Sequence, residues 1–389
     1  MIDVPAAEPR RRLVALDVLR LLAVMLVLGR HMPIAPDTWS APVREAFRAW
    51  QRGGWVGVDL FFVLSGFLVS GLLFNEYQRR GRFSAVRFYV RRGWKIYPPF
   101  FLLLAVSVAV SVWYGSAPDS TTLISESFFL QSYMPGLWPH TWSLAVEEHF
   151  YFLLPLVLLL VLRQNRERED PFRSILPLGA LIAVVVLGLR LYNWHNRPVY
   201  SDLTHLYATH LRLDSLFFGV VISYVYHFHR VRFVEFTAQW RALLVAGGIL
   251  LLMPVFLFTL QSTPLLYVAG LTIIYIGCGM LLMGALACEK EASRSLGRIG
   301  TCGSYSYSIY LWHLPVMLWG VPLVQRAMGR RLTFSAGAAL YIAGSLCVGV
   351  VMAKLVEVPA LALRDRWFPS HGSGRGIANT PTLPEVAIP

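Results

Sequence analysis

The chain has 389 residues, of which 56% are hydrophobic and only 15% are charged, and its formal net charge is +13. This composition is too apolar for a soluble domain of that length and predicts a polytopic membrane protein. In a soluble protein the positive charge would favour a nucleic-acid partner. Here the basic residues lie mainly in alternate loops, so we expect the lipid bilayer as partner and no nucleic acid.

Apolar runs long enough to cross about 30 Å of hydrocarbon occur about ten times. An even number places both termini on one side of the membrane, and the Arg-rich loops on that side predict that it is cytoplasmic. Arg44, Arg48 and Arg52 in the first outer loop are exceptions to this rule, as are the arginines of the last outer loop. The predicted spans are 13–31, 54–75, 97–115, 142–162, 174–191, 211–229, 241–260, 264–288, 304–325 and 334–357.

We therefore expect an all-α integral membrane protein, a polytopic bundle of about ten transmembrane helices, in a bacterial-type cytoplasmic membrane. The expected division is a cytoplasmic arm over 1–12, a transmembrane domain over 13–360, and a cytoplasmic, largely disordered tail over 361–389. The segment 121–135 is too short and polar to span, so it lies at the outer face or re-enters the membrane. The four cysteines show neither metal nor disulfide spacing, and no metal is expected.

The first span carries Arg20 and His31 on one helix face. They are eleven residues apart, so at about 100° and 1.5 Å per residue their side chains share a face and lie roughly 16 Å apart along the axis. Ionisable residues inside a membrane span are costly and by default indicate a functional site. The alternative is structural: Asp17 precedes Arg20 by one turn and is placed to pair with it, and His31 lies near the water.

Asp59, in the second span, has a structural explanation that we favour: small residues let helices pack closely there, and the carboxylate pairs with an arginine. At the start of the third span, Arg91, Arg92 and Lys95 lie within about one turn of each other. They either contact anionic lipid at the cytoplasmic leaflet or form, with Arg20, a clamp for phosphates.

The fourth span opens with HTWSLAVEEHFYFLLPL, and its Glu147 and Glu148 are expected at the depth of His31. Two carboxylates in an apolar helix are hard to explain as packing. A histidine and a glutamate at one depth suit a general base and its orienting partner. Trp142, in the same segment, is a candidate for acceptor contact or structural support.

The outer loop 190–210 is either an interfacial aromatic belt or the floor of a sugar-type acceptor site. Arg212 and Asp214 follow it and are most simply explained as an internal structural pair. His313, in the middle of the ninth span, is more typical of a satisfied core residue than of a catalyst.

The fragments LDVLRLLAVMLVLGRH, GVDLFFVLSGFLVS, RRGWKIYP, WSLAVEEHFYFLLP, RLDSLFFG and YSYSIYLWHLPV occur in this order. Together they resemble the integral-membrane acyltransferase-3 family over residues 13–360. The resemblance implies a ten-helix core that moves an acyl group, usually acetyl, from cytoplasmic acyl-coenzyme A to a hydroxyl on the far side of the membrane. Acceptors in that family are mostly cell-envelope polysaccharides and peptidoglycan, with some macrolides.

The family's Arg-x10-His motif corresponds to Arg20 and His31, and its glutamate in the WSL-x-VE segment corresponds to Glu147. Its basic motif corresponds to residues 92–95, where Lys95 replaces a common second arginine and so loses bidentate phosphate recognition but keeps the charge. We expect acyl-coenzyme A, most simply acetyl-coenzyme A, as co-substrate, with its phosphates on Arg20, Arg91, Arg92 and Lys95.

His31 is expected to act as general base on an acceptor hydroxyl, with Glu147 supporting it. The acceptor is a saccharide or another small molecule such as a macrolide. Two other classes of protein stay open at this point: a transporter or flippase that uses the same polar residues as a pathway, and a sensor that binds acyl-coenzyme A without turnover.

Overall fold

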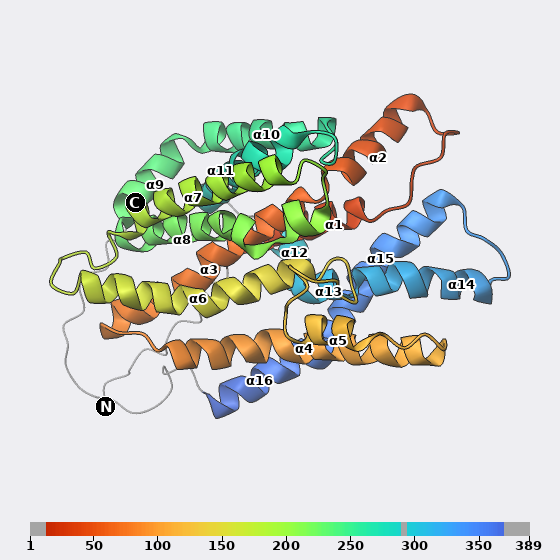
Figure 1. Cartoon of the computed structure of the whole chain (residues 1–389), viewed down its shortest axis with the longest axis horizontal. Helices are drawn as coiled ribbons and strands as arrows, with labels where there is room; N and C mark the ends of the chain where they lie inside the picture. Colours follow the sequence, from red (N-terminus) through yellow and green to blue (C-terminus); the bar gives the residue numbers. More distant parts are fainter. Residues whose placement is uncertain (1–12, 289–293, 369–389) are drawn as a thin grey trace.

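The computed structural model describes residues 13–288 and 294–368, and these residues form helices and loops without a β-strand (Figure 1). The first half contains α1 (Val14–Arg30), α2 (Ala41–Gly53), α3 (Val56–Arg80), α4 (Ala85–Trp113), α5 (Ser120–Ser127), α6 (Trp142–Gln164), α7 (Ile175–Asn196), η1 (Leu203–Tyr207) and η2 (Thr209–Leu211). The second half contains α8 (Leu213–Phe228), α9 (Arg230–Gln239), α10 (Arg241–Leu257), η3 (Leu266–Gly270), α11 (Leu271–Ala287), α12 (Arg294–Gly303), α13 (Ser306–Pro315), η5 (Val316–Gly320), α14 (Val321–Ala327), α15 (Phe334–Met352), η6 (Ala353–Glu357) and α16 (Val358–Trp367).

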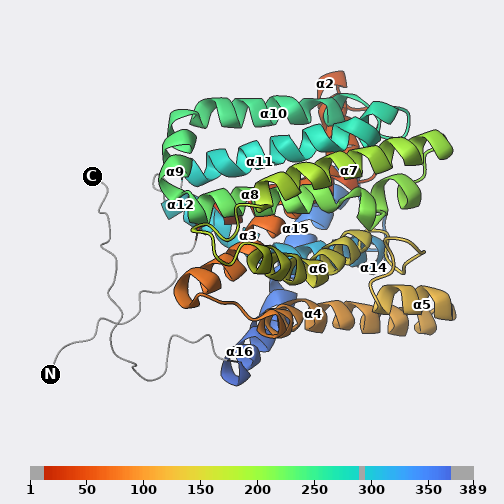
Figure 2. The ribbon, with the colours of Figure 1, turned by 60° about the vertical axis from the view of Figure 1, so that its left-hand side comes forward.

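The helices lie in layers with α3 at the centre (Figure 2). On one side, α8 and α11 pack against α3, with α7 and α10 beyond them; on the other, α6 separates α3 from α4 and α16. The most apolar stretch of α3 is 78% buried, whereas that of α7 is only 17% buried. Helix α3 is therefore the core of the bundle, and α7 presents most of its apolar surface to the lipid.

All the predicted apolar runs are helical in the structure, and the chain is an all-α polytopic membrane protein. Within the described residues, 7 helical stretches are long and apolar enough to span a bilayer, or 8 if α9 and α10, which meet at 75°, form one broken span. Helices α1 and α8 are shorter, at 17 and 16 residues. The exact count of about ten spans and the cytoplasmic side of both termini stay predictions.

The crossing of α3 and α8 depends on two glycines. A Cβ atom on Gly66 would lie 1.9 Å from the backbone oxygen of Leu216, and one on Gly219 would lie 2.2 Å from that of Val63. Small residues allow such backbone contact between helices in a membrane, where packing rather than the hydrophobic effect drives association. The small residues noted in the second span therefore have a packing role.

Helix α4 begins twelve residues earlier than the span predicted over 97–115, at Ala85 instead of residue 97. Ser84 caps it by accepting a hydrogen bond from the backbone N–H of Arg87. The basic segment that contains Arg92 and Lys95 is therefore helical, and it enters the bundle as the first turns of a 29-residue helix.

The segment that includes α5 and continues to residue 141 buries several of its side chains in the protein and exposes others. Glu126 is buried, which raises the pKa of its carboxyl, and it accepts a hydrogen bond from the backbone N–H of Leu137 at 2.8 Å. Phe129 has a φ of 58°, which is rare for a bulky residue, and its ring stacks on Phe100 with centroids 4.5 Å apart. His140, near the end of the segment, is also buried. The start of α6 is therefore surrounded by protein.

The arginines of α2, exceptions to the positive-inside pattern, have local partners. Arg48 pairs with Asp37 at 3.1 Å and with Glu45 at 3.0 Å. Arg52 donates hydrogen bonds to the backbone oxygens of Phe256 and Leu257 at the end of α10. These contacts neutralise or occupy the basic groups of the first outer loop.

The expected arm over 1–12 and residues 369–389 of the expected tail lie outside the described residues. Helix α16 continues to Trp367, past the predicted domain end at residue 360.

We predict that Gly66→Ala lowers the thermal stability of the protein in detergent by about 1–3 kcal/mol, because the added methyl group forces α3 and α8 apart. Gly188→Ala on α7 is the matched control, since nothing lies within 4 Å of its added Cβ. It should leave the unfolding temperature unchanged or raise it slightly. Equal unfolding temperatures for the two variants would show that the crossing does not depend on this contact.

Candidate active site

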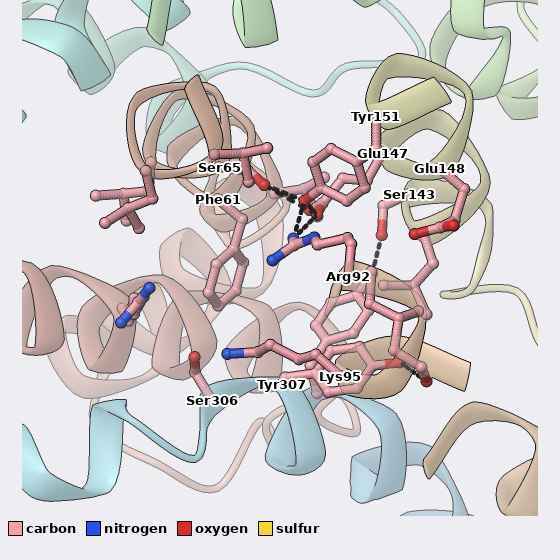
Figure 3. Close-up of a pocket in the computed structure, with 18 of the residues that line it drawn as sticks. Phe61, Ser65, Arg92, Lys95, Ser143, Glu147, Glu148, Tyr151, Ser306 and Tyr307 are labelled. Atoms are coloured by element: carbon pink, nitrogen blue, oxygen red, sulfur yellow. Dashed lines mark hydrogen bonds and ion pairs between the residues drawn. The ribbon is translucent and has the colours of Figure 1, made fainter. Parts of the chain in front are cut away.

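A cavity of about 890 Å³, including the open space at its mouth, lies between α1, α3, α4, α6 and α13 (Figure 3). Its lining combines apolar side chains with basic, acidic and hydroxyl groups, so it suits an amphipathic ligand that carries negative charge. The polar lining residues are Arg20, Ser65, Arg92, Lys95, Ser143, Glu147, Glu148, Tyr151, Ser304, Ser306, Tyr307 and Tyr310.

Four of these residues, Ser65, Arg92, Glu147 and Tyr151, form one connected cluster, joined by dashed lines in Figure 3. The Arg92 guanidinium donates to the Tyr151 hydroxyl, lies 4.1 Å from the centre of that ring and 3.9 Å from Glu147 Oε2. The hydroxyls of Tyr151 and Ser65 both donate to the same Glu147 oxygen. Glu147 therefore balances the charge of Arg92 and holds its planar group in one orientation.

The other two cations of the cavity are also held by carboxylates. Arg20 pairs with Asp17 at 3.0 Å, one turn earlier on α1, as the structural alternative expected. Lys95 Nζ lies 3.8 Å from Glu357, which itself accepts a hydrogen bond from Ser308. Both side chains nevertheless line the cavity. Arg20 and Lys95 therefore keep their carboxylate partners and still face the cavity. With Arg92, the cavity brings together three cations from α1 and α4.

Glu148 also lines the cavity, and it accepts a hydrogen bond from the Tyr97 hydroxyl at 3.1 Å. Its Oε1 atom is buried and has no hydrogen-bond partner among the described residues. Both carboxylates of the Glu147–Glu148 pair thus reach the cavity from the same side, with one committed to Arg92 and the other partly unpartnered.

His31 lies at the other end of α1, directly after its last residue, and does not line the cavity. Its ring packs against that of His313, with centroids 5.1 Å apart. The expected pairing of His31 with Glu147 is wrong, because Glu147 is bonded to Ser65 and Tyr151 in the Arg92 cluster. The physical reason is helix rise: His140, just before α6, lies near the His31–His313 contact, and Glu147 is seven residues further along, about 10 Å toward the basic residues.

Two buried ion pairs hold the centre of the bundle. Arg212 donates to Asp59 at 2.7 Å and Arg190 to Asp214 at 2.6 Å, and all four side chains are at most 1% exposed. The expected pair of Arg212 with Asp214 is therefore wrong in its partners, and Asp59 pairs with an arginine as the packing explanation required. Arg212 and Asp214 are two residues apart, so their side chains point about 200° apart around the helix and reach different partners.

The comparisons with known proteins agree on one family. A family model described as an acyltransferase domain matches residues 13–354. The chain belongs to the acyltransferase-3 family. The peptidoglycan O-acetyltransferase OatA of Listeria monocytogenes is 26% identical over 387 residues, which cover 94% of this chain and 58% of that protein. No solved structure matches the chain.

Two further relatives have similar coverage. The putative peptidoglycan O-acetyltransferase YrhL of Bacillus subtilis is 28% identical over 344 residues, or 81% of this chain and 50% of that protein. The O-acetyltransferase OatA of Staphylococcus aureus is 24% identical over 332 residues, or 79% of this chain and 51% of that protein. The chain thus spans about half the length of the curated relatives that it matches.

The acyltransferase-3 motif residues are divided between two places. Arg20, Arg92, Lys95 and Glu147 meet at the cavity, whereas His31 lies against His313. Arg91 does not line the cavity, because adjacent helical residues point about 100° apart. It pairs with Asp365 at 3.1 Å and donates to the backbone oxygen of Phe368, which fastens α16 to α4.

Trp142 supports the arrangement without lining the cavity. Its ring stacks on Tyr207 with centroids 4.5 Å apart and lies 5.9 Å from the Arg212 guanidinium. It therefore packs beside the buried Arg212–Asp59 pair, in the structural role that was one of its two expected roles.

Sequence reasoning missed Tyr151, Tyr310 and His140. Tyr151 follows Glu147 by four residues, so the helical period alone places both on one face of α6 and could have indicated it. The positions of Tyr310 and His140 carry no comparable local signal, because their contacts join α13 to the segment before α6.

We predict that Asp59→Ala destabilises the protein by about 3–5 kcal/mol, because the Arg212 charge would stay buried without its partner. Asp37→Ala is the control: the Asp37 side chain is 87% exposed, and losing its surface pairs should cost at most about 1 kcal/mol. Thermal unfolding in detergent measures both. An Asp59→Ala variant of normal stability that has lost all activity would instead assign Asp59 to the reaction.

Proposed function

We propose that the chain is a membrane O-acyltransferase that moves an acyl group, most simply acetyl, from cytoplasmic acyl-coenzyme A to a hydroxyl of a cell-envelope saccharide. The observation that carries the proposal is the convergence of Arg20, Arg92 and Lys95 on one cavity, with His31 at the other end of the helix that supplies Arg20. Membership of the acyltransferase-3 family supports the reaction class.

In this proposal the three cations bind the phosphates of coenzyme A. Arginine binds phosphate through a planar set of donors, and lysine acts as a point charge. Because α1 is a regular helix from Val14 to Arg30, Arg20 and His31 are about 16 Å apart along its axis. An extended phosphopantetheine arm is of comparable length and would carry the thioester from the cations to the imidazole.

His31 acts as the general base of the transfer. It takes the proton from the acceptor hydroxyl as the oxygen bonds to the thioester carbonyl carbon. The carbon–sulfur bond then breaks, and the leaving thiolate takes the proton from the His31 imidazolium. Glu147 contacts Arg92 and Tyr151. Its role in this proposal is to orient Arg92, which binds phosphate, and not to support His31.

The printed names of the relatives support a cell-wall saccharide acceptor, since two of them are described as peptidoglycan O-acetyltransferases. A macrolide or similar metabolite is the second candidate, with the same chemistry at the acceptor hydroxyl. A transporter that uses the polar residues as a pathway would move an acceptor without acylating it.

We predict that sealed vesicles of known orientation transfer labelled acetyl from acetyl-coenzyme A to an acceptor only when the donor is on the cytoplasmic side. Arg20→Ala should raise the KM for acetyl-coenzyme A about tenfold or more, because it removes a charged hydrogen-bonding group from the phosphates. His31→Ala should lower kcat on the order of 100-fold or more, because the base is lost.

Arg79→Ala, an exposed change at the cytoplasmic end of α3, is the matched control and should retain both constants. Acceptor that crosses the membrane without label would support the transporter instead. A His31→Ala variant that inserts normally and keeps full transfer would reject His31 as the base.

We also predict that purified protein in vesicles acetylates soluble peptidoglycan fragments in preference to a macrolide presented at the same concentration. Saccharides and macrolides differ in the surface around the hydroxyl, so the pocket should discriminate between them by kcat/KM. Mass spectrometry of both acceptors in one reaction measures the ratio. A ratio that favours the macrolide would change the acceptor class and leave the donor chemistry intact.

A further inference from the structure

Three histidine rings form a row that begins at His31. The His31 and His313 centroids are 5.1 Å apart, and those of His313 and His140 are 4.8 Å apart. His313 and His140 are buried, at 0% and 2% exposure. Among the described residues, no group of three or more His, Cys, Asp or Glu side chains has the geometry of a metal site.

Backbone carbonyls determine which nitrogen carries the hydrogen in each buried ring. His313 Nδ1 lies 2.6 Å from the Tyr310 carbonyl oxygen, and His140 Nε2 lies 3.2 Å from that of Leu311. A carbonyl oxygen only accepts, so these two nitrogens are the N–H donors. Burial lowers the pKa of His140 to about 3, so that ring is neutral. In the neutral rings, His313 Nε2 and His140 Nδ1 therefore keep their lone pairs.

Neither lone pair has a hydrogen-bond partner among the described residues. A buried polar atom without a partner costs free energy, and native structures rarely keep one without a role. A hydrogen bond between two imidazoles, with nitrogens about 2.9 Å apart, puts the ring centroids roughly 5 Å apart. The 5.1 Å separation of His31 and His313 thus matches this bond, and a rotation of the partly exposed His31 ring would complete it.

The same row is coupled to the cavity through Tyr310. Its hydroxyl donates to the His140 carbonyl oxygen at 2.6 Å and contacts Ser143 Oγ, also at 2.6 Å. Both Tyr310 and Ser143 line the cavity. Tyr310 therefore holds His140 and also lines the cavity in which the phosphopantetheine arm of coenzyme A would lie.

We propose that His313 is the positioning residue of the general base: its Nε2 lone pair accepts the hydrogen of the His31 imidazole and turns the other nitrogen of His31 toward the acceptor hydroxyl. When His31 takes the acceptor proton, the same hydrogen bond stabilises the imidazolium, and His313 keeps its own hydrogen on the Tyr310 carbonyl. His140 packs against the far side of His313 and keeps it in place. This inference rests on the proposed function, in which His31 is the base.

The test compares His313→Leu, which matches histidine in size but has no acceptor, with His313→Gln, whose amide oxygen can replace the Nε2 lone pair. For His313→Leu we expect kcat to fall on the order of 100-fold while the KM for acetyl-coenzyme A stays within about twofold, because the cations are untouched. His313→Gln should recover at least about tenfold of that loss. If His313→Leu does not fold, His313→Met provides a flexible apolar replacement.

His227→Leu, a histidine of α8 that contacts Ser223 and Asn75, is the matched control and should retain both constants. In a His31→Ala background, His313→Leu should cause no further loss, since residues that act as a unit are not additive.

The outcomes separate the two proposals. Normal kcat in His313→Leu, together with an inactive His31→Ala, would overturn the role of His313 and leave the acyltransferase proposal standing. Equal losses in the Leu and Gln variants, or a loss confined to KM, would likewise assign His313 a structural role. Full activity of His31→Ala would overturn both.

Discussion

A charge inside the hydrocarbon of a bilayer is costly unless another charge or water faces it, and this constraint explains where most polar groups of the protein lie. At the centre of the bundle, Arg212 with Asp59 and Arg190 with Asp214 satisfy it by closed pairing. At the cavity, the cations keep a carboxylate on one side and a ligand space on the other. The first arrangement holds helices together, and the second leaves charge available to a substrate.

Helices α3 and α1 contribute differently to the closed ion pairs and to the cavity. Helix α3 supplies Asp59 to the closed pairs, Gly66 to the backbone contact with α8, and Ser65 to the cavity cluster. The site is therefore built directly on the most buried helix, so that its geometry depends on the packing of the whole core. Helix α1, by contrast, carries Arg20 in its second turn and is followed directly by His31, so it connects the cavity to the histidine row.

Much of the fold was predictable from the sequence because membrane spans are long apolar runs, and a regular helix determines which of its residues share a face. That is why Arg20 and His31 were expected on one face of α1, roughly 16 Å apart along the axis, whereas the place of Arg20 at the cavity and of His31 outside it is known only from the structure. For Arg92 and Lys95 the sequence left open contact with anionic lipid or a phosphate clamp with Arg20. The structure places both side chains at the cavity with Arg20, on a helix that starts much earlier than the apolar run.

Partners on different helices were not predictable, because they depend on depth and rotation that no single segment determines. Glu147 was expected at the depth of His31. It is His140, just before α6, that lies near the His31–His313 contact, and Glu147, seven residues further along, lies beside Arg92. His313 was expected to be a core residue with all its hydrogen bonds made. Its Nε2 atom has no partner among the described residues, and this depends on where the Tyr310 carbonyl and the His31 ring lie around it.

The positive φ of Phe129 occurs where the segment before α6 packs against α4, close to a second contact in which the Trp138 indole donates to Ser107 Oγ. A bulky residue in that conformation carries a strain of about 1–3 kcal/mol, which persists only while the surrounding structure enforces it. The stacking of Phe129 on Phe100 of α4 provides that restraint, and the same buried segment continues to His140. The segment that carries His140 is thus fixed to α4 by an apolar ring contact and by a hydrogen bond, so the position of the histidine row depends on apolar packing as well as on polar contacts.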